Sequence, residues 1–297
     1  MTQASPDILI VGAGPAGLSA AMRARRYGLS VQVVDDQPDP GGQIWRGVER
    51  AGQAGRAARL GAAYAEGRAV VARFRRCGAD FAPETTLWHI EDGPVAFLGA
   101  AGEVSRIAPR AVLLATGAQE RPTPFRGWTL PGVMTVGAGQ ILLKTSGQVP
   151  RGPVWIAGTG PLAYLFAVQL LSAGVEISGV LDTRAPGSIR GSLGPAASAL
   201  LGRPADLAKG LTWLARIKRR CRHIAHVGHL RAEGDGALER ITYTVAGRAP
   251  VSVAARHLFV HEGLVPAIHP TMALGCAHRW SPAQDSYAPV VDPWGET

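Results

Sequence analysis

The sequence of 297 residues contains few cysteines and few aromatic residues. Its three cysteines, Cys77, Cys221 and Cys276, lie far apart and form no C-x-x-C pair, which excludes a redox disulfide motif and a cysteine zinc site. Aromatic residues make up only 6% of the chain, whereas glycine occurs 38 times and proline 22 times. This composition indicates many tight turns and excludes a coiled coil, a collagen helix and a small disulfide scaffold.

Long apolar runs are absent as well. No stretch reaches the roughly 18 consecutive apolar residues that a membrane-spanning helix needs. The first apolar run, residues 7–18, contains Asp7 and three glycines and follows no basic segment, so we expect no signal peptide. The sparse, odd number of cysteines fits a reducing compartment, and we expect a cytoplasmic protein.

Positive charge is in excess, with a net charge of +9 at pH 7. Only three of the 31 basic residues are lysines, and the one dense run, residues 216–222, is most simply the solvated face of a helix. We therefore predict no nucleic-acid partner. His223, His226 and His229 are close in sequence, but no carboxylate or cysteine pair completes a metal site, and we predict none.

The N-terminal segment has the pattern of a complete βαβ unit. An apolar run at residues 8–11 predicts a buried strand, a helix follows to about Tyr27, and residues 31–34 predict a second strand. Between the first strand and the helix stands the fingerprint G-x-G-x-x-G, formed by Gly12, Gly14 and Gly17. In such a turn the glycines allow the tight bend, the approach of a pyrophosphate and close helix packing. We expect Asp35, at the end of the second strand, to bind a ribose, although a register shift of one residue would give that role to Asp36.

A second copy of this pattern begins near residue 154. Residues 154–157 predict a strand, Gly158-x-Gly160-x-x-Ala163 forms the turn, a helix follows at 164–172, and residues 175–181 predict a strand that ends at Asp182. We therefore predict an α/β fold with two Rossmann-like domains, of which the second is inserted in the first. Each domain has a parallel sheet with helices, and small antiparallel β elements complete the fold. We expect a first dinucleotide-binding domain at 1–125, a second nucleotide domain at 126–262 and the start of a return to the first domain at 263–297, with a boundary connector at 127–131.

The remaining segments have weaker patterns. Residues 48–66 predict a single helix, residues 187–201 at most a helix, and residues 207–220 an amphipathic helix. Strands are predicted at 111–115, in an antiparallel sheet from 85–90, 95–98 and 103–107, and in a hairpin from 238–245 and 251–260, whereas the last 35 residues look irregular. Gly41-Gly42-Gln43 fits a chain that passes close to a flat ligand, or an ordinary surface turn.

These residues resemble a known superfamily of flavoproteins. The two fingerprints and the Ala-Thr-Gly strand end at 115–117 resemble the FAD-dependent pyridine-nucleotide-disulfide-reductase-like superfamily. Three segments, GGQIWR at 41–46, LLATGAQERPTPFRGWTLPGVMTVGAGQ at 113–140 and HEGLVPAIHPTMALGCAHRW at 261–280, are similar to one branch of it. That branch comprises the flavoprotein alpha subunits of opine oxidases, hydrogen cyanide synthase and dye-linked proline or hydroxyproline dehydrogenases.

The resemblance implies a role for each matching residue. Gly12, Gly14 and Gly17 would hold the FAD pyrophosphate, Asp35 the FAD ribose, and Gly42 with Gln43 would line the flavin. Thr116 and Gly117 match the strand end that returns the chain to the FAD domain. Gly158, Gly160 and Asp182 would form a second site for NAD(P) or another nucleotide, unless that site has lost its ligand. An acid at 182 favours an unphosphorylated ribose, and Arg184 nearby weakens that preference.

The sequence also departs from the family. It has no cysteine pair beside the flavin segment, which excludes disulfide reduction. It ends with VVDPWGET at 290–297, where the branch continues into a Gly-Asp segment that contacts FAD, often followed by a cysteine-rich iron–sulfur segment. We therefore expect a fragment, a truncated gene product or half of a split subunit that holds FAD weakly.

The resemblance implies an FAD-dependent oxidoreductase subunit, for which we nominate no catalytic side chain. It would transfer electrons or hydride in the oxidation of an amine or amino-acid substrate (opine, glycine, proline or hydroxyproline) together with an amine-oxidising flavoprotein beta subunit. The alternatives are a non-catalytic nucleotide-binding or assembly protein and a stand-alone NAD(P)H-dependent flavin reductase.

Overall fold

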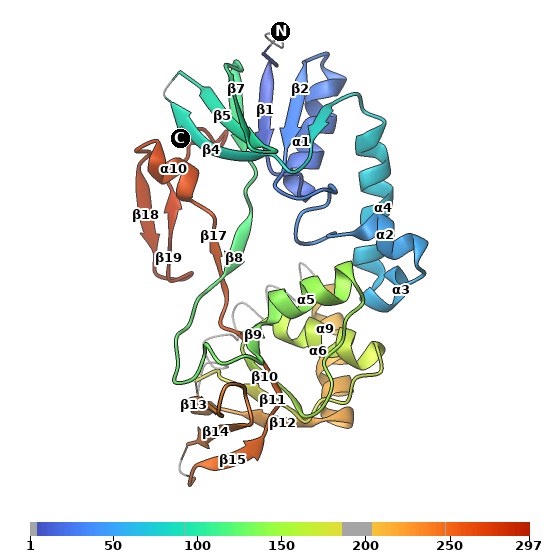
Figure 1. The fold of residues 1–297 in the computed structure, drawn as a ribbon, viewed down its shortest axis with the longest axis vertical. Coiled ribbons are helices and arrows are strands. Elements are labelled where there is room, and N and C mark those ends of the chain that lie inside the picture. The colour runs from blue at the N-terminus through green and yellow to red at the C-terminus, as the bar shows by residue number, and fades with distance from the viewer. Residues whose placement is uncertain (1–4, 92, 186–203, 247) are drawn as a thin grey trace. The chain divides into compact units, whose positions relative to one another are not determined.

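The computed structural model describes residues 5–91, 93–185, 204–246 and 248–297, shown in Figure 1. The chain forms two compact units. Unit 1 consists of residues 1–119 and 264–297, and unit 2 of residues 120–263. The connector at 127–131 lies within unit 2.

A four-stranded parallel sheet forms the centre of unit 1. Its order is β3-β2-β1-β7, and Ile8 pairs with Val31 on one side and with Ala111 on the other. The strands are β1 (Ile8–Val11), β2 (Val31–Val34), β3 (Asp80–Ala82) and β7 (Ala111–Leu114). Strand β3 has no alternating pattern and was not predicted.

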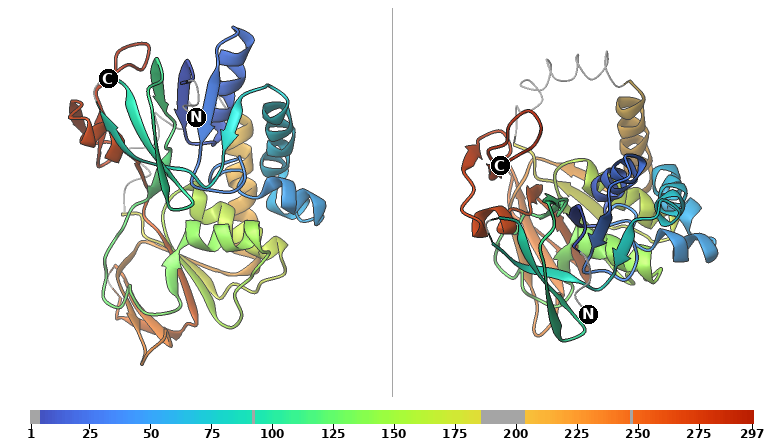
Figure 2. Two further views of the ribbon diagram at one scale, coloured as in Figure 1. Left: turned by 45° about the horizontal axis from the view of Figure 1, so that its top comes forward. Right: turned by 90° about the horizontal axis from the view of Figure 1, so that it is seen from above.

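The two faces of this sheet are covered by different layers, as Figure 2 shows. Helix α1 (Pro15–Arg26) covers one face, where Ile10 points toward Gly17. An antiparallel sheet of β4 (Thr86–Glu91), β5 (Val95–Ala100) and β6 (Glu103–Ile107) covers the other. There Leu9 and Val11 form a core with Ala96 and Leu98, since alternate residues of a strand face opposite sides.

The single helix predicted for residues 48–66 is wrong. Three helices occupy this region and extend farther: α2 (Val48–Gln53), α3 (Ala57–Leu60) and α4 (Ala62–Arg75). Gly55 and Gly61 interrupt them with φ values of +68° and +103°, which a right-handed helix does not contain. Trp45, which precedes α2, binds the start of α4, because its indole nitrogen donates a hydrogen bond to the carbonyl of Ala63 at 3.1 Å.

The C-terminal part of unit 1 is more regular than predicted. Strand β17 (Leu264–Pro266) pairs with β8 (Ala118–Glu120), and helix α10 (His269–Ala273) follows and contacts β4. An antiparallel hairpin of β18 (His278–Ser281) and β19 (Ser286–Pro289) comes next. Its Trp280 and Tyr287 rings pack edge to face with centroids 5.1 Å apart.

Unit 2 contains a five-stranded parallel sheet of order β12-β11-β10-β16-β9. Its strands are β9 (Val133–Thr135), β10 (Val154–Gly158), β11 (Gly179–Asp182), β12 (Arg222–Ala225) and β16 (His257–His261). Its helices are α5 (Val136–Thr145), α6 (Pro161–Ser172) and α9 (Pro204–Arg220). Phe166 of α6 packs edge to face on Phe259 of β16, with ring centroids 4.9 Å apart.

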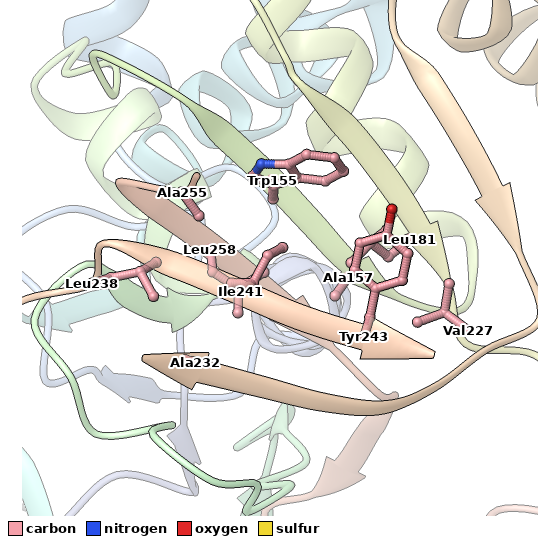
Figure 3. Close-up of a cluster of buried hydrophobic side chains, with 10 residues drawn as sticks. All are labelled: Trp155, Ala157, Leu181, Val227, Ala232, Leu238, Ile241, Tyr243, Ala255 and Leu258. Atoms are coloured by element: carbon pink, nitrogen blue, oxygen red, sulfur yellow. The ribbon is translucent and has the colours of Figure 1, made fainter. Parts of the chain in front are cut away.

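The other face of this sheet packs on a three-stranded antiparallel sheet of β13 (Val227–Glu233), β14 (Arg240–Val245) and β15 (Val251–Ala254). Figure 3 shows the core between them, in which Trp155 and Leu258 of the parallel sheet lie near Ile241 and Tyr243. All four side chains are at most 4% exposed. This core fixes the position of the parallel strands, whose carboxyl ends carry the second candidate site.

Several element boundaries in unit 2 differ from the prediction. The strand predicted at 251–260 is two strands, because β15 ends at Ala254 and β16 belongs to the parallel sheet. The strand predicted at 175–181 is shorter, since β11 begins at Gly179. The helix considered at 187–201 lies outside the described residues.

The predicted α/β fold, with two Rossmann-like parallel sheets and small antiparallel sheets, is confirmed. Among the residues that the structure describes, none of the helices combines the length and apolar character needed to cross a membrane.

Candidate functional site

The first glycine turn follows β1 and leads into α1. Gly12 has a φ of +106°, and a Cβ atom there would lie 2.4 Å from the carbonyl oxygen of Ala115. A Cβ at Gly17 would lie 1.9 Å from the carbonyl oxygen of Gly12. Both positions therefore require glycine, because the backbone of the turn and the helix fill the space.

Gly14 differs from these two glycines. Its φ of −75° and ψ of −177° are open to any residue, and the nearest atom to an added Cβ is the Cα of Gly42, 3.9 Å away. Gly14 is the N-cap residue of α1, which has no side-chain cap and no acidic residue in its first turn. No side chain therefore caps the amide groups of the first turn, in which Pro15 has no amide hydrogen, and such a helix terminus attracts phosphate.

The glycine pair after β2 packs directly on this turn. Gly41 donates its amide hydrogen to the carbonyl of Ala13 at 2.8 Å, and a Cβ at Gly42 would lie 2.7 Å from the Cα of Gly14. Gly42 also has a φ of +56°. Contact between two backbone segments therefore explains this glycine without a flat ligand. Gln43, predicted to line the flavin, has an exposed side chain.

Asp35 and Asp36 have different surroundings. Asp35 is 9% exposed, and its carboxylate accepts hydrogen bonds from the amides of Ala13 at 2.6 Å and Gln37 at 2.9 Å. Asp36 is exposed. Burial raises the pKa of Asp35, the two amide donors lower it in part, and the nearby Asp36 carboxylate raises it further. Of the two acids, only Asp35 touches the glycine turn.

Thr116 and Gly117 follow β7 and bind the segment after β17. The Thr116 hydroxyl donates to the carbonyl of Ala267 at 2.9 Å, and the amide of Ala267 donates to the carbonyl of Gly117 at 3.0 Å. Gly117 has a φ of +71°. These two residues thus hold the returning chain against the end of β7.

The second glycine turn, between β10 and α6, repeats this arrangement. A Cβ at Gly158 would lie 1.9 Å from the carbonyl oxygen of His261, and Gly158 has a φ of +139°. Gly160 is the N-cap residue of α6 and has a φ of +93°. The nearest atom to a Cβ added at Gly160 is Nε2 of His261, 3.9 Å away. Helix α6 also has no side-chain cap and no acidic residue in its first turn.

Asp182, the acid of the second unit, is already surrounded by donors. Its side chain is 2% exposed and accepts hydrogen bonds from the Tyr164 hydroxyl at 2.9 Å, the Arg184 amide at 3.0 Å and the Arg184 guanidinium. Burial raises the pKa of Asp182, but these donors outweigh it and hold the pKa below its usual value. Burial, and then the Asp182 carboxylate, raises the pKa of Tyr164 to about 12. A carboxylate has about four lone-pair sites, and here they are taken by the protein itself.

Sequence reasoning missed a hydrogen-bonded, largely buried pair beside the second turn. Nδ1 of His261, at the end of β16, lies 2.7 Å from Oε1 of Glu120. The other carboxylate oxygen of Glu120 accepts the amide hydrogen of Gly137, at the start of α5, at 2.6 Å. Glu120 and His261 are 141 residues apart, so no local pattern announces the pair.

The cysteines and the histidine group show no further site. All three cysteines lie in described segments and none is in a disulfide. Nε2 of His223 lies 3.5 Å from the Tyr164 hydroxyl, and Nδ1 of His226 lies 3.1 Å from the carbonyl oxygen of Arg184. Within the described ranges, no group of three or more His, Cys, Asp or Glu residues could hold a metal ion.

Comparison with known proteins agrees with this geometry. The family model described as pyridine nucleotide-disulphide oxidoreductase matches residues 6–199. An opine oxidase subunit of Rhizobium meliloti (strain 1021) is 42% identical over 288 residues, 96% of this chain and 62% of that protein. Hydrogen cyanide synthase subunit HcnB of Pseudomonas aeruginosa is 35% identical over 285 residues, 92% of this chain and 60% of that protein.

Solved structures show the same fold at low sequence identity. Thioredoxin reductase of T. acidophilum superposes with a TM-score of 0.65 at 17% identity, over 98% of this chain and 86% of that one. L-proline dehydrogenase of P. horikoshii superposes with a TM-score of 0.64 at 19% identity, over 97% of this chain and 48% of that one. The chain spans about 60% of the length of the curated relatives given above.

Proposed function

The chain belongs to the pyridine nucleotide-disulphide oxidoreductase family, and we propose that it binds FAD and serves as the electron-transferring chain of an amine or amino-acid oxidoreductase. Membership confirms the resemblance seen in the sequence, and it supports the proposal of an FAD-dependent oxidoreductase. The relatives named above are subunits of an oxidase and a synthase, so this class of chain works with others.

The open cradle at Gly14 is the observation that carries the proposal. Gly12 and Gly17 have their Cβ space filled by backbone, whereas the space at Gly14 is open in front of the uncapped α1 terminus. This arrangement fits a pyrophosphate. When bound there, FAD supplies the ring that accepts or passes on a hydride.

The residues that would hold FAD act by binding and orientation. The turn at Gly12, Gly14 and Gly17 would bind the pyrophosphate, and Asp35, which also fixes the Ala13 amide, would accept a ribose hydroxyl. We keep Gly42 and Gln43 as the segment that lines the flavin, and Thr116-Gly117 as the strand end that holds the returning chain. No side chain is assigned a catalytic role.

The second unit would bind a nucleotide at Gly158 and Gly160, and NAD(P) is the first candidate. Asp182 would be the ribose-binding acid, although its engagement by Arg184 and Tyr164 leaves it no free acceptor in this arrangement. A stand-alone NAD(P)H-dependent flavin reductase is therefore the weaker candidate function. A non-catalytic assembly chain would keep the fold but bind no FAD.

We place the substrate among opines, glycine, proline and hydroxyproline, oxidised with a partner flavoprotein subunit. The test incubates the FAD-loaded protein anaerobically with each compound, with and without the candidate partner flavoprotein subunit, and follows flavin absorbance. Bleaching by one amine that requires the partner is the expected result. Bleaching by NADH alone would favour the flavin reductase, and a protein that binds no FAD would refute the proposal.

A further inference from the structure

The second glycine turn lies beside His261, the last residue of β16. The side chain of His261 is 4% exposed, and in the described part of the chain its ring makes one hydrogen bond, from Nδ1 to Glu120 at 2.7 Å. The edge of the ring formed by Nε2 and Cδ2 lies beside Gly160, where an added Cβ atom would be 3.9 Å from Nε2 and 4.0 Å from Cδ2. It therefore borders the open space in front of the uncapped start of α6.

From this juxtaposition we propose that His261, oriented by Glu120, is a diphosphate-binding residue of the second unit, which takes a nucleoside diphosphate group between Nε2 of His261 and the N-terminus of α6. The inference rests on the proposed nucleotide site of unit 2. It adds the residue that contacts the phosphates.

The hydrogen bonds around His261 indicate how it would work. Glu120 accepts at Nδ1, and a phosphate oxygen would accept at Nε2, so the ring would donate from both nitrogens, as only a protonated imidazole does. Glu120 is itself fixed by the Gly137 amide at 2.6 Å, so it acts as the positioning residue.

Other charged groups surround the pair. Glu262, the next residue, has its pKa raised by burial, and it accepts a hydrogen bond from the Thr183 hydroxyl at 2.8 Å. Asp182 is paired with Arg184, and Arg121 lies beside Gly263. Because Asp182 is engaged by the protein, the phosphates rather than the ribose carry the recognition at this site.

The test is calorimetric titration with ADP, with adenosine as the probe that lacks phosphate. It uses the Gly14→Val variant and the FAD-saturated protein, so that the first turn does not compete for ADP. ADP should bind one site, and adenosine should not. Titration with NADH asks whether the same site takes a dinucleotide.

Three variants separate the role of His261 from a structural one. His261→Ala should weaken ADP binding by about 10-fold to about 100-fold, the loss of one charge-assisted hydrogen bond. Glu120→Gln should largely retain ADP binding, since its amide can donate to Nδ1 of a ring that still donates from Nε2. His229→Ala, which changes an exposed histidine of β13, is the matched control and should leave binding unchanged.

The outcomes are distinct from those for FAD. Unchanged ADP affinity in His261→Ala, or no ADP binding by either protein form, would overturn the inference even if FAD binds in full. His261-dependent ADP binding by a protein that holds no FAD would support the inference and refute the proposed function. Thermal unfolding of each variant checks that unit 2 remains folded.

Discussion

Replacing Gly14 by Val should abolish FAD binding while leaving the fold intact. The backbone at Gly14, with φ −75° and ψ −177°, accepts a valine, and the nearest atom to the new Cβ is 3.9 Å away. The Cβ atom therefore fits without displacing protein atoms, and the side chain enters the space that we assign to the pyrophosphate. The expected change in the free energy of unfolding of the apo-protein is within about 1 kcal/mol, the scale of an N-cap substitution.

The cost should fall on the ligand. A displaced pyrophosphate loses hydrogen bonds from the first turn of α1, each worth about 1.5–3 kcal/mol when one partner is charged. The loss of two such bonds weakens binding by a factor of about 100 or more. FAD affinity is measured by titration of the apo-protein, and stability by urea unfolding without FAD, because a bound ligand would itself stabilise the fold.

Two other glycines of the same βαβ unit serve as controls. Gly17→Ala should lose both stability and FAD, because its Cβ would lie 1.9 Å from the carbonyl oxygen of Gly12. Gly28→Ala, which follows α1 at a φ of +79° with no atom within 4 Å, should cost some stability but leave FAD affinity unchanged. Wild-type FAD affinity in Gly14→Val, or unfolding as severe as that of Gly17→Ala, would refute the reasoning.

Two further substitutions test the acids of the two units. Asp35→Ala should weaken FAD binding by about 1–3 kcal/mol and also lower stability, because the buried Ala13 amide loses its acceptor. Titration and urea unfolding should show no comparable change for Asp36→Ala, which alters an exposed side chain. Equal losses in the two variants would mean that Asp36 binds the ribose. Arg184→Ala should free Asp182 to accept ribose hydroxyls and so shift the relative affinity of unit 2 toward NADH over NADPH. Parallel titrations with both nucleotides measure the ratio, and an unchanged ratio would show that the pair plays no part in selection.

The sequence predicted the parts of the fold that depend on local patterns. Strands β1, β2 and β10 and helix α1 lie where their apolar runs and glycines indicate, since a buried parallel strand has a continuous apolar pattern. Strand β16 was assigned to a hairpin because residues 251–260 have one continuous strand-like pattern. The change of sheet occurs at Arg256, whose amide donates to the carbonyl of Pro153, a contact that only the folded chain reveals.

The candidate sites were predictable to a similar extent. The fingerprint gave the positions of the glycines, but only the structure distinguishes Gly14, with open space at its Cβ, from Gly12 and Gly17, which are packed by backbone. The pair of Glu120 and His261 joins residues 141 apart, so it could not be seen in any sequence window. Arg184 lies only two residues from Asp182, so its influence on ribose selection could be inferred from the sequence. Its hydrogen bonds to the Asp182 carboxylate could not.

The most direct test of the central claim is to titrate the apo-protein with FAD and, separately, with FMN, which lacks the pyrophosphate and the adenosine. If the turn at Gly12, Gly14 and Gly17 binds a pyrophosphate, FAD should bind one site per chain, and FMN should bind at least about 100-fold more weakly, since it forgoes those hydrogen bonds. Equal affinity for the two flavins, or no binding of FAD, would contradict the account.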